Sequence, residues 1–247
     1  MGLKTAALSI PSGILRRLGY GVYRIGEKRQ YTLNLPNEYA TYSPWFEDWF
    51  QEIYGGVQDH TLLKADMCYV VYQFCRHCLH ANGDFAECGV YKGGSAFLIA
   101  STMTKRPVEG RLLHLFDTFA GYPAAANADP SPVQEGSYGD TSLTKVKDYL
   151  KAFPFIAFHP GLIPETLESV RDRRFAFVYI DVDLYQTTRD CLDFFYSRLV
   201  PGGVMLFGDY GFALFADSEK RAVDEFFSDK PESPIALHTG QCIVVKV

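Results

Sequence analysis

The amino-acid sequence predicts an α/β fold with a doubly wound, mostly parallel sheet, and three observations support this prediction. Residues 85–100 are typical of a short apolar strand, a glycine turn and a helix in succession. Further apolar strands and helical segments then alternate to the end of the chain. Acidic residues follow several of these strands directly. Such a sheet binds its ligand at the carboxyl edge of the strands, where these acids are expected.

Residues 1–60 precede this pattern, and we expect them to form an aromatic-rich helical extension packed on a domain that spans 61–247. The aromatic residues of 31–60 are compatible with simple packing, with a roof over a binding cleft, and with a contact between copies in a homo-oligomer. Near the N-terminus, a short amphipathic helix is expected either to pack on the domain, the simpler explanation, or to contact a membrane surface or a partner. Its apolar residues are Ile10, Ile14, Leu15 and Leu18.

A long helix is predicted over residues 61–80. The spacing of Cys75, Cys78 and His80 suggests a zinc site, but these residues continue an apolar helical face, so buried thiols are the simpler explanation. The 6 cysteines of the chain are scattered, without a secretion signal or the spacing of a disulfide scaffold. We therefore expect a protein of the reducing cytoplasm.

The glycine turn of residues 85–95 narrows the choice of ligand. Its glycines follow the pattern Gly-x-x-x-Gly-Gly, whereas dinucleotide-binding proteins carry Gly-x-Gly-x-x-Gly to approach a pyrophosphate. Glu87, at the end of the strand, disfavours a phosphate and suits a cationic or hydroxylated ligand. S-adenosylmethionine (SAM) is cationic and carries no phosphate. Taken alone, this stretch is equally compatible with a purely structural turn.

A second strand, over residues 112–116, ends at Asp117. An acid at this place in such a unit accepts hydrogen bonds from ribose hydroxyls, although aspartate also ends strands as a turn former. The polar, glycine- and proline-rich residues 118–141 follow, and we interpret them as a lid over the substrate, with plain disorder as the alternative. Asp140, Thr141 and Ser142 are expected to cap the next helix.

Three more strands complete the parallel part of the sheet. The strand over 155–159 leads into Gly161, Leu162 and Ile163, small and apolar residues suited to the adenine face of SAM. The strand over 176–180 opens into Asp181 and Asp183, and the strand over 204–208 ends at Asp209. A helix over 217–227 and two strands near 235–238 and 242–247 finish the domain.

The acids after these strands are expected to meet, because carboxyl ends of neighbouring parallel strands converge on one crevice. Asp181 and Asp209 are therefore predicted neighbours. Facing carboxylates repel one another unless a cation or a proton lies between them, and Mg²⁺ prefers such oxygen ligands. Helix capping is the alternative role for Asp181 and Asp183.

Bulk composition excludes some classes of function. A chain of 247 residues with 47% hydrophobic and 21% charged residues can form one large globular domain. The net charge of −5, with no basic run, argues against a nucleic-acid partner. No apolar stretch approaches the length of a membrane span.

Five segments, found in the same order, together resemble the macrocin O-methyltransferase family over about residues 60–247. The resemblance implies a Rossmann-like class I SAM-dependent methyltransferase fold, with a seven-stranded sheet and one antiparallel C-terminal strand. It also implies methyl transfer to sugar or aryl hydroxyls of antibiotics and related glycosides, with SAM and usually Mg²⁺. The segments are FAECGVYKGG (85–94), DTFAG (117–121), DVDLYQTT (181–188), PGG (201–203) and DYG (209–211).

The resemblance also implies roles for individual residues. Asp181 is the expected metal ligand and base, and Asp209 a second ligand. Gly208 departs from the family, which usually has an acid there, so either Asp183 or water compensates or the metal binds weakly or not at all. The expected cofactor-binding residues are Glu87, Gly89, Tyr91 and Ser95 after the first strand, Asp117 and Thr118 after the second, and Gly161, Leu162 and Ile163 after the third.

We therefore predict a SAM-dependent O-methyltransferase that acts on a hydroxyl of a sugar or glycosylated natural product, with assistance from Mg²⁺. Without a metal, Asp181 or a histidine such as His159 is expected to act as the base. Two alternatives stay open: a SAM-binding protein that has lost catalysis, and a nicotinamide-dependent oxidoreductase, which the glycine spacing disfavours. The expected partner is a small-molecule or glycoside acceptor.

Overall fold

The computed structural model describes residues 31–33, 40–124, 126 and 129–247, which fall into two compact units, 1–52 and 53–247. The amphipathic segment predicted near the N-terminus lies outside the described residues. The first unit contains an antiparallel pair of short strands and a 3₁₀ helix, and helix α2 begins in it. The predicted role of residues 1–60 as a packed extension stays a prediction. These elements are β1 (Tyr31–Leu33), β2 (Ala40–Tyr42), η2 (Pro44–Phe46) and α2 (Asp48–Val57).

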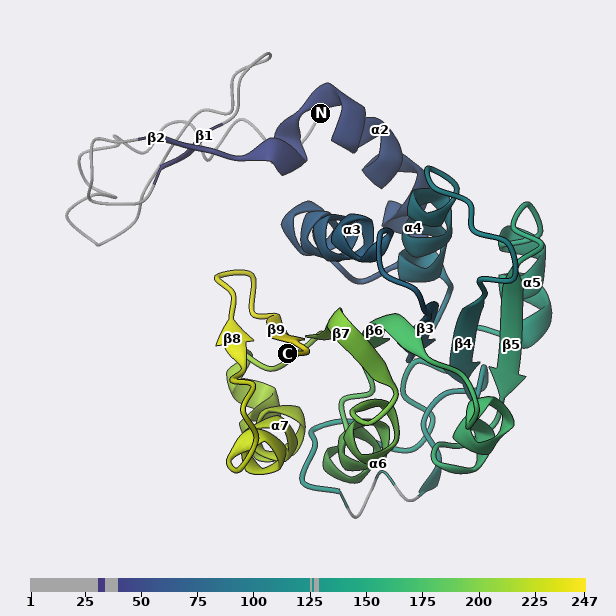
Figure 1. The fold of residues 1–247 in the computed structure, drawn as a ribbon, viewed down its shortest axis with the longest axis vertical. Coiled ribbons are helices and arrows are strands. Elements are labelled where there is room, and N and C mark those ends of the chain that lie inside the picture. Colours follow the sequence, from purple (N-terminus) through teal and green to yellow (C-terminus); the bar gives the residue numbers. More distant parts are fainter. Residues whose placement is uncertain (1–30, 34–39, 125, 127–128) are drawn as a thin grey trace, which may run out of the picture. The chain divides into compact units, whose positions relative to one another are not determined.

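The second unit is built on a seven-stranded sheet in the order β5-β4-β3-β6-β7-β9-β8 (Figure 1). The first five strands in this order are parallel, and β9 lies antiparallel between β7 and β8. This confirms the predicted doubly wound sheet with one antiparallel C-terminal strand. The strands are β3 (Asp84–Cys88), β4 (Leu113–Asp117), β5 (Ile156–Pro160), β6 (Phe175–Ile180), β7 (Leu199–Phe207), β8 (Ile235–Ala236) and β9 (Cys242–Val245).

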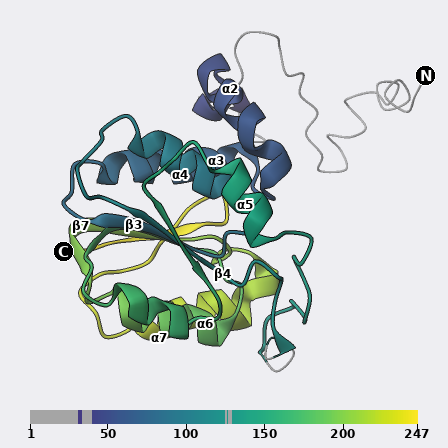
Figure 2. The same cartoon turned by 90° about the vertical axis from the view of Figure 1, so that its right-hand side faces the viewer.

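Helices cover both faces of this sheet (Figure 2). One layer holds α3, α4 and α5, and the opposite layer holds α6 and α7. A turn of π-helix, η7, leads directly into α7, so the helix predicted over 217–227 is irregular at its start. The helices are η3 (Gln58–His60), α3 (Ala65–Cys78), α4 (Gly94–Met103), α5 (Leu143–Tyr149), η5 (Glu165–Val170), α6 (Tyr185–Phe195), η6 (Ala213–Phe215), η7 (Ala216–Lys220) and α7 (Arg221–Phe227).

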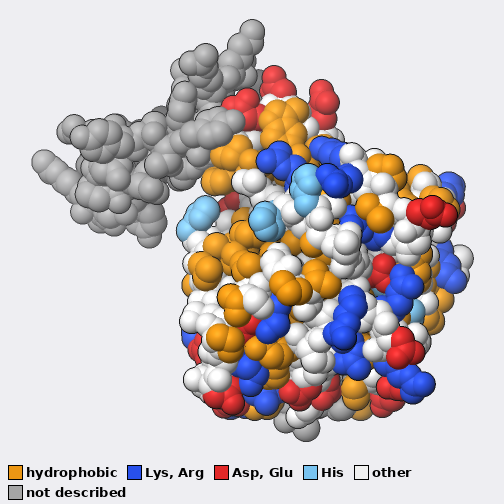
Figure 3. Space-filling model, in the orientation of Figure 1, with side chains coloured by type: hydrophobic (Ala, Val, Ile, Leu, Met, Phe, Trp, Pro, Cys, Tyr) orange, Lys and Arg blue, Asp and Glu red, His pale blue; other side chains and the backbone are white. Residues whose placement is uncertain are grey.

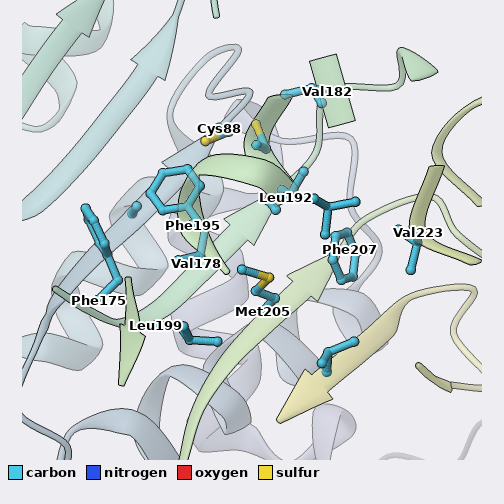
Figure 4. Close-up of a cluster of buried hydrophobic side chains, with 14 of the residues drawn as sticks. Cys88, Phe175, Val178, Val182, Leu192, Phe195, Leu199, Met205, Phe207 and Val223 are labelled. Carbon is cyan, nitrogen blue, oxygen red and sulfur yellow. The ribbon is translucent and has the colours of Figure 1, made fainter. Parts of the chain in front are cut away.

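The central strands are buried along their whole length, as parallel strands covered on both faces must be. Between the sheet and the layer of α6 and α7, a cluster of large apolar side chains forms one half of the core (Figure 4). All six cysteines are buried free thiols, Cys75 and Cys78 among them. This agrees with a packing role for the cysteines of α3. The labelled core residues include Phe175, Val178, Leu192, Phe195, Met205 and Phe207.

The order of the strands creates a switch point beside β3. The chain runs outward from β3 to β4 and β5, and then returns to place β6 on the other side of β3. Ligands of such sheets bind in the crevice at the carboxyl ends of the two strands flanking this point. The crevice is narrow at its base, because a Cβ atom on Gly89 (φ +88°) would lie 1.9 Å from the backbone oxygen of Asp181. Only glycine fits there.

The surface carries charges of both signs. On the face shown in Figure 3, Lys and Arg side chains are interspersed with Asp and Glu side chains. No helix among the described residues is long and apolar enough to cross a membrane.

Candidate active site at the carboxyl edge of the sheet

Glu87 lies at the base of the crevice, on β3, and is completely buried. Ser95, in the first turn of α4, donates a hydrogen bond to Glu87 Oε1, while Glu87 Oε2 has no hydrogen-bond partner among the described residues. Burial raises the pKa of Glu87 well above its usual value, and the charges of Asp181 and Asp117 add to this. Since an unpaired buried acceptor is costly, this oxygen fits a cationic or hydrogen-bond-donating ligand such as SAM.

Asp117 organises the glycine turn from the neighbouring strand. Its Oδ2 accepts hydrogen bonds from the backbone N–H groups of Val90 (2.6 Å) and Tyr91 (2.9 Å), and its Oδ1 accepts one from Phe119 (2.6 Å). A carboxylate offers about four acceptor positions, so about one is left for a ribose hydroxyl. The contacts with the glycine turn agree with the turn-forming role that the sequence left open for Asp117, and its ribose-binding role stays a prediction. Thr118 donates its hydroxyl to the backbone oxygen of Gly121 (2.7 Å), within its own loop.

The loop after β5 lies next to the end of β4, because the N–H of Gly161 donates to the backbone oxygen of Asp117 (3.0 Å). Ile163 packs against the hydrophobic core, whereas Leu162 is 45% exposed. The predicted contact of Leu162 and Ile163 with the adenine stays a prediction.

Three carboxylates come together on the other side of the crevice. Asp181, Asp183 and Asp209 each offer one oxygen, and these oxygens lie within 4.8 Å of one another. Burial, followed by the charge of Asp183, raises the pKa of Asp181 to about 7. Burial is also the main cause that raises the pKa of Asp209, and a hydrogen bond with Asp183 adds to it. The predicted meeting of Asp181 and Asp209 therefore occurs.

Asp183 joins this group as a third carboxylate. Its backbone is in the left-handed region (φ +59°), which aspartate adopts more readily than most other residues. Two tyrosines hold the group in place. Tyr179 donates its hydroxyl to Asp181 Oδ2 (2.9 Å), and Tyr122 donates its hydroxyl to Asp183 Oδ2 (2.8 Å).

This donor set fits a hard divalent cation such as Mg²⁺, because it consists of carboxylate oxygens only and gathers several negative charges in little space. Asp181 and Asp209 are the predicted ligands, and Asp183 adds a third. Gly208 contributes no side chain. A Cβ atom at Gly208 would lie 2.1 Å from Asp181 Oδ1, so the Asp181 carboxylate occupies the space that a side chain there would need.

Sequence reasoning missed Glu219. It stands in the run Asp217–Arg221, where four of five residues are charged, a pattern that favours a solvent-exposed face. In the structure Glu219 is completely buried, and one of its oxygens accepts a hydrogen bond from the backbone N–H of Asp209 (2.8 Å). Its Oε2 has no hydrogen-bond partner among the described residues.

His159 does not face the acids. Its Nε2 lies 3.0 Å from His114 Nδ1, and its Nδ1 lies 2.9 Å from Ser169 Oγ. With both ring nitrogens engaged, His159 offers no free base to the site. Asp181 is the better candidate.

Residues of the predicted lid are anchored at several points. Thr141 donates its hydroxyl to the backbone oxygen of Tyr91 (2.7 Å), and Asp140 pairs with Lys92. Of the three residues predicted to cap α5, only Ser142, just after the lid, does so, by accepting from the N–H of Lys145. Asp129 accepts hydrogen bonds from the N–H groups of Tyr185 (3.0 Å) and Gln186 (3.2 Å), at the start of α6. With Tyr122 on Asp183, these contacts bring the segment against the acid group.

Comparison with known proteins gives a family match. Residues 76–236 match the model of the family described as Macrocin-O-methyltransferase (TylF). One similar curated protein is the 8-demethyl-8-(2,3-dimethoxy-alpha-L-rhamnosyl)-tetracenomycin-C 4'-O-methyltransferase of Streptomyces olivaceus, 28% identical over 152 residues, which are 56% of this chain and 58% of that protein. Another is the mycinamicin III 3''-O-methyltransferase of Micromonospora griseorubida, 27% identical over 153 residues, 55% of this chain and 60% of that protein. The chain thus matches less than two thirds of the length of these relatives.

Solved structures show the same fold. The O-methyltransferase NovP superposes with a TM-score of 0.65 at 22% identity, over 76% of this chain and 82% of NovP. The calicheamicin methyltransferase CalS11 superposes with a TM-score of 0.62 at 15% identity, over 90% of this chain and 99% of CalS11.

Proposed function

The chain belongs to the macrocin O-methyltransferase family, and from this premise we propose that it transfers a methyl group from SAM to a hydroxyl of a sugar or glycosylated small molecule. One observation carries the proposal. At the switch point of the sheet, the buried Glu87, with one oxygen unpartnered, lies on one side, and the group formed by Asp181, Asp183 and Asp209 lies on the other. The first side suits a cationic cofactor and the second suits activation of a hydroxyl.

SAM supplies a methyl carbon on a sulfonium, which the acceptor oxygen attacks in line with the departing sulfur. Glu87 faces the cationic part of the cofactor, and Asp117 offers its remaining acceptor position to the ribose. Leu162 and Ile163 cover the adenine. The other predicted contacts come from the two turns and from α4, at Gly89, Tyr91, Ser95, Thr118 and Gly161.

Asp181 takes the proton of the acceptor hydroxyl in this proposal. Tyr179 orients its carboxylate, and burial keeps its pKa near that of a useful base, at about 7. Asp181, Asp209 and Asp183 would hold Mg²⁺, which when bound lowers the pKa of a hydroxyl that it contacts. Much of the rate enhancement comes from holding the two reactants in line, as expected for a direct displacement.

We expect aromatic side chains near the two turns to contact the acceptor. Tyr138 packs edge-on against Tyr91 of the cofactor turn and against Tyr122, and is 38% exposed. The exposed Phe212 follows Asp209 closely in the chain. These rings suit the apolar face of a sugar, and similarity to the rhamnosyl-tetracenomycin and mycinamicin enzymes supports a glycoside acceptor.

The six free cysteines support a cytoplasmic location. A homo-oligomer stays a prediction.

Loss of catalysis is the second candidate function, because Gly208 lacks the family's usual acid. Calorimetry with SAM, followed by measurement of S-adenosylhomocysteine release with a panel of glycosides, sugar nucleotides and phenols, separates the two. We expect SAM binding and methyl transfer to a glycoside. SAM binding without transfer to any acceptor supports the lapsed enzyme, and binding of NADH in place of SAM supports the oxidoreductase.

A further inference from the structure

We propose that Glu219 is a fourth acid of the metal centre, which lies beside Asp209 and supports the binding of a cation by Asp181, Asp183 and Asp209. The inference deepens the proposed function and rests on it for the identity of the site. The ligand class is a hard divalent cation.

The first step is the burial of Glu219. The residue is completely buried, and Oε1 accepts a hydrogen bond from the N–H of Asp209 (2.8 Å). Its Oε2 is also buried and has no hydrogen-bond partner among the described residues. A buried carboxylate oxygen without a hydrogen-bond partner destabilises the folded protein, and nothing in the fold compensates for this cost. The oxygen is therefore expected to serve a ligand.

The second step is where Glu219 points. It lies in η7, a single turn of π-helix, and such turns occur frequently at functional sites. Its neighbour Asp217, in the same turn, is exposed, so the turn directs one acid outward and the other inward. Its hydrogen bond with the N–H of Asp209 (2.8 Å) places Glu219 beside the group of three acids. The charges of Asp181 and Asp183 also act on Glu219.

The third step is the shape of the site at Gly208. A Cβ atom there would lie 2.1 Å from Oδ1 and 2.7 Å from Cγ of Asp181, and 3.2 Å from the Tyr179 hydroxyl. An acid at this position would displace the Asp181 carboxylate from its hydrogen bond with Tyr179. A fourth carboxylate is therefore accommodated from η7 and not from position 208.

A purely structural role is the alternative, in which Glu219 only caps the N–H groups that follow β7. The two roles differ in what they require. A cap needs a neutral or charged acceptor oxygen, and the amide oxygen of glutamine provides one. A metal-site acid needs the negative charge.

The test is binding of Mn²⁺, used as a spectroscopic substitute for Mg²⁺, to the intact chain by calorimetry and electron paramagnetic resonance. Glu219→Gln keeps the capping oxygen and removes the charge. Asp217→Asn makes the same change of charge on the exposed side of the same turn. We expect Glu219→Gln to weaken Mn²⁺ binding about 10- to 100-fold, as loss of a supporting group of a metal site does, and Asp217→Asn to leave it nearly unchanged.

Equal Mn²⁺ affinity in Glu219→Gln and wild type overturns the proposal, as does a wild type that binds no Mn²⁺. SAM affinity, measured in parallel, shows that the variant is folded. A second measurement needs no variant: in wild type labelled with ¹³C at the glutamate carboxyls, a ¹³C coupling to bound Mn²⁺ is expected, and its absence overturns the proposal. Neither the Mn²⁺ affinity nor the ¹³C coupling depends on methyl transfer. Both measurements therefore test the role of Glu219 even if no acceptor is found and the proposed function fails.

Discussion

Two polar clusters, each with a buried acid, lie on the same sheet, and they differ in how completely their polar atoms are paired. In the first, Asp84 Oδ2 lies 3.0 Å from His114 Nε2, and the chain of contacts continues through His159 to Ser169. Arg173 adds an opposite charge to Asp84. His114 can donate to Asp84, and His159 can donate to His114. The contacts therefore join neutral or oppositely charged groups, without repulsion between like charges. We call this set the histidine chain.

The second cluster consists of acids only: Asp181, Asp183 and Asp209, whose oxygens lie close together, and Glu219, which accepts a hydrogen bond from the N–H of Asp209. Glu219 Oε2 has no hydrogen-bond partner among the described residues. We call these four residues the acid cluster. Paired buried charges specify and stabilise a fold, whereas like charges held together destabilise it and mark a site that awaits a ligand. The comparison therefore assigns stability to the histidine chain and chemistry to the acid cluster.

The largest expected effect is a loss of methyl transfer when an acid of the acid cluster is replaced. Asp181→Asn removes the proposed base, and we expect methyl transfer to fall by about 10²- to 10⁴-fold, the usual contribution of a general base. Turnover is measured as release of S-adenosylhomocysteine. Asp193→Asn, an exposed acid on α6, is the matched control and should keep full activity. Wild-type turnover in Asp181→Asn would remove the acid cluster from the reaction.

The next effect is on stability, in the histidine chain. Asp84→Ala leaves His114 and Arg173 without their shared acid, and we expect a loss of about 3 kcal/mol in the free energy of unfolding, at the lower end for a broken buried pair because Arg173 is partly exposed. Urea unfolding measures it. Asp172→Ala changes a highly exposed acid nearby and should cost little. An equally small loss in both variants would show that the histidine chain does not stabilise the fold.

Asp117 combines features of both clusters, since its backbone contacts are paired while its predicted ligand contact is not. Asp117→Ala should weaken SAM binding by about 1.5–3 kcal/mol, the worth of hydrogen bonds to a charged group. Calorimetry with SAM gives the change. If SAM affinity is unchanged while the variant is less stable, Asp117 serves only the glycine turn.

The smallest effect concerns pH. Burial, followed by the charge of His114, lowers the pKa of His159 to about 4 from its usual value of about 6.5. As the pH falls from about 6.5 to about 4, the unfolded chain binds a proton that folded His159 does not, so stability falls through this window and is unaffected above it. Unfolding midpoints of His159→Asn should depend less steeply on pH in this window than those of wild type. An equal pH dependence of the unfolding midpoints in wild type and His159→Asn would contradict a lowered pKa of His159.

The sequence was sufficient to predict the sheet and much of the acid cluster, because parallel strands share one carboxyl edge and Asp181 and Asp209 each follow such a strand. The hydrogen bond between Tyr122 and Asp183 joins residues 61 positions apart, and no local pattern indicates such a contact. Glu219 was missed because it stands in a charged run, which is typical of an exposed face, whereas the fold buries it completely. The link between Asp84 and His114 joins strands across 30 residues, and no local pattern indicates such a pair.

The most direct test of the difference between the two clusters is the free energy of unfolding of Asp181→Asn in chelating buffer without SAM. If the acid cluster destabilises the fold in order to serve the reaction, removing one of its mutually repelling acids should leave the variant as stable as wild type or more stable. A loss of more than about 1 kcal/mol, the net worth of an ordinary hydrogen bond, would show that Asp181 is held for structure and would contradict the account.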